Sequence, residues 1–321
     1  MTLPRRRALG ALALVGGLAL AGRGAEAATA RLVLGTATPG GGFPLYGGAV
    51  IDTLKEIDPD LAIEARNTKG STENVPLLEA GTLDMALVQG EIAYEALAGI
   101  GRPAAPVRII AAMYSTPGMF AVRADSPYRR IADLRGKPVV FGARGSGLVV
   151  LARYVLDGIG LDQERDFQAI YLDHAGDGPP MVLDGRAAAL WGGGVGWPGF
   201  AALAASPGGA RFIAPDAEEA ARIRARHAFL KPLAVPAGSY PGQSAAIPSV
   251  GSWSFILARA NLADDLAYRL ARDLHAGEAA LAQRLAQARE TTAANTVAAA
   301  PRADFIHPGA RRYLHEIGLI P

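Results

Sequence analysis

Short apolar runs alternate with amphipathic stretches along most of this chain, at spacings that suit units of one β-strand and one α-helix. Such units favour parallel strands, because the helix carries the chain back across the sheet. In the first series the pattern predicts strands at 31–36, 61–66, 84–89, 107–114 and 119–123, a helix from 43, and helices at 74–80 and 92–97. The helix from 43 is expected to bury Val50, Ile51 and Leu54. This series predicts one α/β lobe.

A second series of the same kind begins at Pro127. It predicts a short helix at 131–134, strands at 138–141, 168–172 and 187–191, and helices at 148–156 and 180–183. Four prolines between 232 and 248 make that segment too rich in helix breakers to be a packed element. The pattern then predicts a strand at 250–258, one or two helices within 262–285 and a last helix at 309–316.

Two such series predict an α/β protein with two lobes, each a mainly parallel sheet with helices on both faces, hinged around a cleft. A chain of 321 residues has room for two lobes, since a single core rarely grows beyond roughly 250 to 300 residues. We expect lobe 1 to comprise 28–123 and 250–321, and lobe 2 to comprise 124–249. The hinge is then expected near 122–126 and 249–253.

The N-terminus has the layout of a secretory signal peptide. Three arginines at 5–7 precede an uncharged run at 8–22, and alanine-rich cleavage sites follow at 25–27 and 28–30. An apolar run of about 15 residues is short of the ~20 that a membrane-spanning anchor needs. We therefore predict a signal peptide at 1–27, with a cut as late as 30, and a periplasmic protein; the paired arginines leave the Sec and twin-arginine routes open.

The charge and the missing cysteines narrow the class further. Removal of residues 1–27 takes away four arginines and one glutamate, which changes the formal charge from +2 to −1. The basic residues form no stripe, so nucleic-acid binding gains no support. Without cysteine there is neither a disulfide nor a lipid-anchored N-terminus.

Catalytic patterns are poorly represented. The first glycine-rich turn has Leu45 where a dinucleotide-binding motif needs its third glycine, and no Gly-Lys-Ser/Thr follows either turn. No G-x-S-x-G elbow surrounds a serine, and the five histidines lack metal-ligand spacing. The sequence thus predicts no cofactor, no metal and no enzyme activity.

Two glycine-rich turns, at 37–42 and 142–147, follow predicted strands and precede predicted helices. Glycine allows a ligand close to the backbone, and free N–H groups at a helix start attract an anion. Arg144 adds a donor suited to a carboxylate, unless it is a solvated surface residue. Thr72 is expected to cap a helix, and Trp191 and Trp197 either fill the core or form an apolar wall. The predicted ligand-binding residues are Thr38, Gly42, Phe43, Tyr46, Ser71, Asn74, Gln89, Glu91, Tyr114, Arg144, Gly145, Ser146 and Trp191.

Six segments in fixed order resemble the TAXI-type solute receptors of TRAP transporters. They are G-S-T-E-N at 70–74, L-L-E-A-G-T-L-D-M-A at 77–86, G-S-G at 145–147, D-G-R at 184–186, Y-P-G-Q at 240–243 and H-P-G-A at 307–310. The resemblance implies a periplasmic binding protein fold of type II character, monomeric, that binds a small carboxylate-bearing ligand and delivers it to TRAP membrane subunits. Amino acids or dicarboxylates are the ligands it implies.

Three departures from the family pattern change the expected pocket. Phe43-Pro44 stands where the family often has two tyrosines, Arg144 where proline is usual, and Leu148 where threonine is common. Two alternatives stay open at this stage: a receptor that feeds a signalling partner, and a secreted α/β enzyme acting on a small metabolite.

Overall fold

The computed structural model describes residues 30–321, so the predicted signal peptide at 1–27 lies outside the described residues. The strands, in chain order, are β1 (Ala30–Gly35), β2 (Leu61–Arg66), β3 (Met85–Val88), β4 (Val107–Arg123), β5 (Pro138–Ala143), β6 (Gln168–Leu172), β7 (Ala189–Gly193), β8 (Ala210–Ile213), β9 (Lys231–Val235) and β10 (Ile247–Arg259). The α-helices are α1 (Gly42–Ile57), α2 (Ser71–Glu79), α3 (Gly90–Ala98), α4 (Gly147–Gly158), α5 (Gly178–Leu183), α6 (Pro198–Ala204), α7 (Ala217–Arg226), α8 (Asp264–Ala276), α9 (Glu278–Arg284), α10 (Ala293–Ala299) and α11 (Pro308–Glu316). Short 3-10 helices are η1 (Ile131–Leu134), η2 (Ala175–Asp177), η3 (Ala286–Glu290) and η4 (Ala303–Phe305).

The strands form one continuous sheet with the order β2-β1-β3-β10-β4-β7-β5-β6, while β8 pairs with β4 and β9 with β10. Pairing is parallel for β1 with β2 and β3, and for β5 with β6 and β7. Every antiparallel pairing involves one of the two long strands, β4 or β10. The predicted α/β class is confirmed. The strands form one mixed sheet and not two mainly parallel sheets, because the long strands β4 and β10 run through both parts and pair antiparallel with their neighbours.

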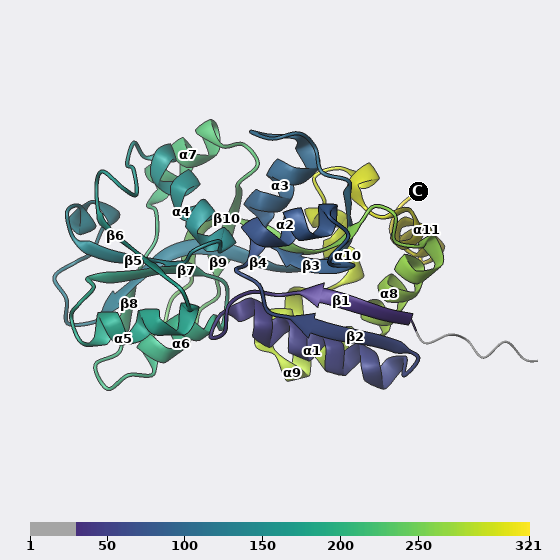
Figure 1. Ribbon diagram of the computed structural model, residues 1–321. Helices are drawn as coiled ribbons and strands as arrows, with labels where there is room; N and C mark the ends of the chain where they lie inside the picture. Colours follow the sequence, from purple (N-terminus) through teal and green to yellow (C-terminus); the bar gives the residue numbers. More distant parts are fainter. Residues whose placement is uncertain (1–29) are drawn as a thin grey trace, which may run out of the picture.

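The sheet has two halves, which lie side by side in Figure 1. We call the part built on β1–β3, with α1–α3 and the C-terminal helices α8–α11, the first half. The part built on β5–β8, with α4–α7, is the second half. Because β1 and α11 both belong to the first half, the two ends of the described chain lie on the same side of the molecule.

Strand β4 runs unbroken through 17 residues, where the sequence predicted two strands with a gap at 115–118. Its pairing changes from β10 to β7 between Pro117 and Gly118. A proline is tolerated there because the ladder changes partners at that point. Gly118 leaves room for Trp191, whose ring would lie 2.7 Å from a Cβ at this position. Strand β4 thus changes its partner before residue 123, where the boundary between the lobes is predicted. The position of that boundary stays a prediction.

Several elements were missed because their patterns are weak. Helix α7 buries only Ile223 and is held by a capping box between Asp216 and Glu219. Strand β9 lies within the proline-rich segment that was expected to be unpacked, and this expectation was wrong. Strand β9 is an edge strand that pairs only with β10. Pro232, which has no N–H to donate, is therefore tolerated in it. The short elements α6, β8 and α10 were also not predicted.

Apolar side chains fill both faces of each half. In the first half, Val88 and Ile109 belong to one buried cluster and Leu87 and Ile110 to another, as expected for alternating residues of strands covered on both sides. Val50 and Leu54 are buried as predicted, whereas Ile51 is only half-buried. The second half has two clusters of its own, centred on Phe120 with Trp191 and on Met119 with Phe200.

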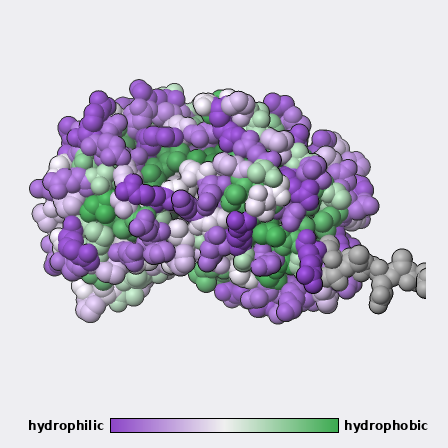
Figure 2. Space-filling model, in the orientation of Figure 1, coloured by the Kyte–Doolittle hydropathy of each residue, from purple (hydrophilic) through white to green (hydrophobic). Residues whose placement is uncertain are grey.

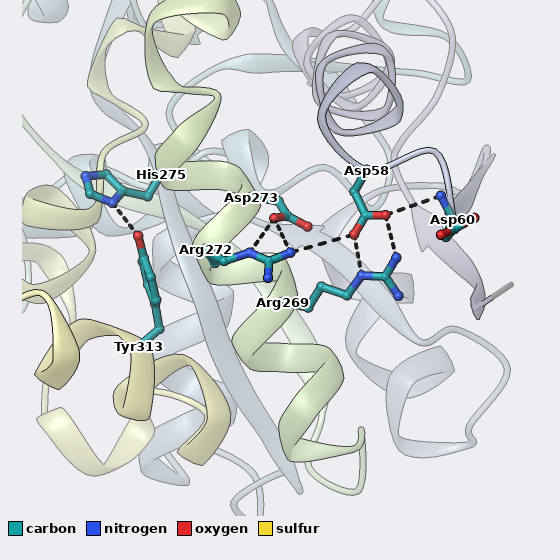
Figure 3. Close-up of polar contacts among 7 residues, drawn as sticks. All are labelled: Asp58, Asp60, Arg269, Arg272, Asp273, His275 and Tyr313. Carbon is teal, nitrogen blue, oxygen red and sulfur yellow. Dashed lines mark hydrogen bonds and ion pairs between the residues drawn. The ribbon is translucent and has the colours of Figure 1, made fainter. Parts of the chain in front are cut away.

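A network of hydrogen bonds and ion pairs connects α8 to the end of α1 (Figure 3). The buried carboxylate of Asp58 accepts two hydrogen bonds from Arg269, and these bonds lower the pKa of Asp58. Nη2 of Arg272 lies 3.9 Å from Oδ2 of Asp58 and 2.8 Å from Oδ1 of Asp273. This network holds the returning C-terminal segment against the first half.

The face of the molecule in Figure 2 is hydrophilic over most of its area, with smaller hydrophobic regions. Within residues 30–321, no helix has both the length and the apolar character needed to cross a membrane.

Candidate functional site

A cleft between the two halves is the place where four helices begin. The N-cap residues of α1, α2, α3 and α4 are Gly41, Gly70, Gln89 and Ser146, and all four line this cleft. Each helix follows a strand of the parallel parts of the sheet, β1, β2, β3 and β5. The carboxyl ends of parallel strands share one edge, so the helix starts converge there. The cleft contains about 660 Å³ of space between its atoms when its open mouth is included.

The local sequence explains the helix starts. Gly70 has a φ of 115°, a conformation that favours glycine, and it sets the chain direction into α2. At α4 the hydroxyl of Ser146 accepts a hydrogen bond from the N–H of Leu148 at 3.2 Å. The remaining N–H groups of these first turns have no partner within their helices and point a positive partial charge toward the cleft.

Seven of the predicted site residues line the cleft, and they are Thr38, Gly42, Phe43, Ser71, Gln89, Tyr114 and Ser146. Ser71 Oγ accepts a hydrogen bond from the N–H of Gln89 at 3.0 Å, which ties α2 to the start of α3. Gln89 Nε2 and the hydroxyl of Thr116 are buried without a hydrogen-bond partner among the described residues. An unpaired buried hydroxyl is costly, so that of Thr116 is suited to bind a ligand, whereas the Gln89 side chain also lies against the buried carboxyl of Glu91 and lowers its pKa.

Tyr46 and Asn74 are buried beside the cleft and have structural partners instead of lining it. Tyr46 OH lies 2.9 Å from the hydroxyl of Thr291, and burial raises its pKa. Asn74 Nδ2 donates to the carbonyls of Thr36 and Leu87, both at 2.8 Å, and so links β1 to β3.

Glu91 and Trp191 are likewise buried away from the lining. Glu91 accepts a hydrogen bond at 2.6 Å from Ser252 Oγ on β10, and its other carboxyl oxygen has no partner among the described residues. Burial raises the pKa of Glu91 to about 7. Trp191 packs in the core of the second half, with its indole N–H donating to the carbonyl of Leu148 at 2.8 Å.

Arg144 does not face the cleft. It is exposed, its guanidinium lies over the ring of Tyr171 at 5.5 Å, and it lines a separate groove on the second half. The alternative of a surface arginine is therefore the one that the structure supports. Gly145 also lies outside the lining, and its carbonyl accepts from the N–H and the hydroxyl of Thr72 at 3.1 and 2.9 Å. Thr72 was predicted to cap α2, but the cap is Gly70.

Sequence reasoning missed several lining residues. The lining residues not predicted include Lys69, Thr116, Leu148 and Leu190. Of the two roles considered for Trp197, an apolar wall is the one its position supports. Lys69 carries the only charge among the described residues that line the cleft. Its place between the end of β2 and the start of α2 is the signal that would have identified it.

The two halves touch on either side of the cleft through glycine backbones. A Cβ at Gly70 would lie 2.9 Å from the carbonyl oxygen of Gly145, and a Cβ at Gly40 would lie 2.7 Å from the Cα of Gly176. Gly40, Gly70 and Gly145 also have φ values in the left-handed region. A side chain at these positions would separate the halves, so the close approach depends on glycine.

Side chains add further contacts between the halves at α3. Tyr94 stacks on Phe229 with ring centroids 4.8 Å apart, and Tyr154 of α4 donates to Glu95 at 2.5 Å. The structure is thus a closed arrangement of the two halves around the cleft. Within residues 30–321, no group of three or more acidic or histidine side chains is placed to hold a metal ion.

Comparison with known proteins agrees with this architecture. A family model described as the NMT1-like family matches residues 34–318. The alkanesulfonate-binding protein SsuA from Xanthomonas axonopodis pv. citri, bound to MOPS, is 18% identical, with a TM-score of 0.51 over 89% of this chain and 83% of that chain. A protein of Bordetella bronchiseptica RB50 is 14% identical, with a TM-score of 0.57 over 90% and 98%. A structure described as a periplasmic transporter is 14% identical, with a TM-score of 0.54 over 82% and 87%. At these identities the structural likeness establishes a shared fold, that of the periplasmic binding proteins.

Proposed function

The chain belongs to the NMT1-like family, and from this premise we propose that it is an extracytoplasmic receptor for a small organic anion. The ligand binds in the cleft between the two halves and is delivered to a membrane transporter. In this proposal the protein works as a monomer in the periplasm, after removal of its signal peptide.

One observation carries the proposal: four helix N-termini and the exposed Lys69 line a cleft whose described lining contains no acidic side chain. Each helix start contributes a positive partial charge, and the first-turn N–H groups that are not already bonded, as those of Thr72 and Leu148 are, add donors where the starts converge. The hydroxyl of Thr116 supplies a further buried polar group without a partner among the described residues. An anion satisfies this arrangement, whereas a cation would find no carboxylate partner among the described lining residues.

Capture is proposed to occur by closure of two lobes, 28–123 with 250–321 and 124–249. A ligand shifts the balance between open and closed forms only as far as it binds the closed form more tightly. The halves are connected at β4 and β10, whose pairings change near Gly118 and Gly251. We propose that bending of the connecting segments, near 122–126 and 249–253, opens the cleft and breaks the contact between Gly145 and Thr72.

The membrane partner is proposed to be a TRAP-type transporter. The support for this partner is the order of the six sequence segments that resemble TAXI-type receptors. Uptake by membrane vesicles that contain TRAP subunits tests it: addition of the loaded receptor should start transport. Transport that starts only with ABC-type subunits would contradict the TRAP assignment.

Calorimetry of the purified protein tests the receptor proposal directly. The ligands are monocarboxylates, dicarboxylates, alkanesulfonates and amino acids, together with amines of matched size. An anion should bind with 1:1 stoichiometry and raise the thermal midpoint, since binding to the native state stabilises it. The bound compound should be recovered unchanged after prolonged incubation. Preferential binding of amines would contradict the proposal, and turnover of the ligand would favour an enzyme.

A further inference from the structure

The described lining of the cleft includes one exposed lysine but no acidic residue. Lys69 is the only charged side chain among the described lining residues. The carboxylate of Glu73 accepts a hydrogen bond from the backbone N–H of Lys69. Glu91, two residues after Gln89, is fully buried and is bonded to Ser252. Neither acidic group therefore faces the cleft as a partner for a cationic ligand group.

One end of the cleft is polar. Gly147 brings the start of α4 against the first half, because a Cβ there would lie 2.4 Å from the Cβ of Gln89 and 3.0 Å from Ser71 Oγ. A Cβ at Gly145 would lie 3.0 Å from the Cβ of Lys69. We call this end the polar pole, and its side chains are Lys69, Ser71, Gln89 and Ser146. Gln89 is only 4% exposed, and its side-chain amide also lies against the buried carboxyl of Glu91.

The other end is aromatic. A Cβ at Gly42 would lie 3.2 Å from Cδ1 of Trp197 and 3.4 Å from the hydroxyl of Tyr114. The rings of Phe43 and Tyr114 meet edge to face, with centroids 6.5 Å apart. We call this end the aromatic pole, formed by Phe43, Tyr114 and Trp197. Leu148 and Leu190 extend the apolar lining.

We propose that the ligand is an organic anion with an apolar body and no cationic group, bound with its charged head at the polar pole and its body at the aromatic pole. The inference rests on the proposed function and narrows its ligand class. An α-amino acid would have to bury its ammonium group without a carboxylate partner, which is costly. A small dicarboxylate has no apolar surface that could cover the aromatic pole. The site thus favours neither ligand class implied by the family resemblance.

A matched set of ligands tests this directly by calorimetry on the purified protein. Phenylalanine differs from 3-phenylpropanoate only by its ammonium group, and succinate retains a carboxylate but lacks the aromatic body. We expect 3-phenylpropanoate to bind about 100-fold more tightly than phenylalanine, because a site without a partner for a polar group rejects it strongly. It should bind at least about tenfold more tightly than succinate, because of the apolar area that its ring buries.

Two variants locate the poles. Lys69→Met should weaken binding of 3-phenylpropanoate about tenfold, while Lys55→Met, the same change on the exposed surface of α1, should leave it unaltered. Phe43→Ala should weaken 3-phenylpropanoate about tenfold but succinate less than about twofold, since only the ring contacts Phe43. Circular dichroism verifies that each variant is folded.

The outcomes separate the two proposals. The ligand class is overturned if phenylalanine or succinate binds at least as tightly as 3-phenylpropanoate, or if 3-phenylpropanoate does not bind. The receptor proposal survives these results as long as some carboxylate or sulfonate binds. It fails if the folded protein binds 2-phenylethylamine in preference to every anion.

Discussion

Replacement of Glu91 by glutamine should remove a pH dependence from the stability of the protein. The carboxyl of Glu91 is fully buried at the start of α3, and burial raises its pKa from 4.5 to about 7. The native state therefore holds a proton that the unfolded chain releases between these two values. Native stability falls as the pH rises through this window, because the folded protein must then ionise a buried group.

The magnitude follows from the shift. A change of one pKa unit corresponds to about 1.4 kcal/mol, so the shift of Glu91 destabilises the native state by about 3 kcal/mol above pH 7 relative to pH 4. Glu91→Gln retains an oxygen that can accept from Ser252 Oγ but cannot ionise. Any cost of the new amide group is the same at every pH. Between pH 4 and pH 8 the free energy of unfolding of the wild type should therefore fall by about 3 kcal/mol more than that of the variant.

Urea titrations of both proteins at pH 4, 6 and 8, with tryptophan fluorescence as the signal, measure this difference. His307 is buried, and burial lowers its pKa, so its own contribution to stability rises with pH. That contribution is common to both proteins and cancels in the comparison. Glu218→Gln, at an exposed glutamate, is the control and should follow the wild type. Parallel stability curves for Glu91→Gln and the wild type would refute the reasoning.

Three further predictions concern the cleft and the core. Thr72→Val removes the hydroxyl bond to the carbonyl of Gly145 and should weaken ligand binding about fivefold by calorimetry, since one hydrogen bond contributes about 1 kcal/mol; unchanged affinity would mean that this contact does not stabilise the closed form. Arg144→Ala should change the affinity less than about twofold, because its side chain is exposed outside the cleft; a tenfold loss would place it at the ligand. Leu78→Ala should lower the free energy of unfolding by about 2–5 kcal/mol in urea, since Leu78 is 1% exposed in the core of the first half; a loss under about 1 kcal/mol would show that the site collapses around the cavity.

The strands and helices that the sequence predicted are those whose signal is local. An apolar run that ends in a glycine-rich turn is readable from neighbouring residues alone, as at β1 and β5. Helix α7 gave no such signal, because Ile223 is its only buried residue and its stability comes from capping and contacts with α4. The continuity of β4 through Pro117 depends on which strands pair with it, and pairing is a tertiary property.

The site was predictable to the extent that its residues follow strand ends. Ser71 and Gln89 lie just after β2 and β3 and do line the cleft. Arg144 also follows a strand, but successive side chains of a strand alternate in direction, and Ala143 is the residue that faces the cleft. Trp191 was ambiguous because β7 pairs on both sides and is buried on both faces. Which residue of a turn faces a ligand is decided by the twist of the sheet, which the sequence pattern does not contain.

The shared position of β1 and α11 in the first half has a practical consequence for measuring motion. The second half is inserted between β4 and β10, so a fluorescent protein fused directly before β1 or after α11 would move with the first half. Energy transfer between two such terminal fusions would be blind to closure. A reporter must instead carry one dye on each side of the cleft, for example at Lys55 of α1 and Glu218 of α7, where both side chains are exposed. If the protein is immobilised by its C-terminus, the inserted half is not tethered and can still move when the cleft closes.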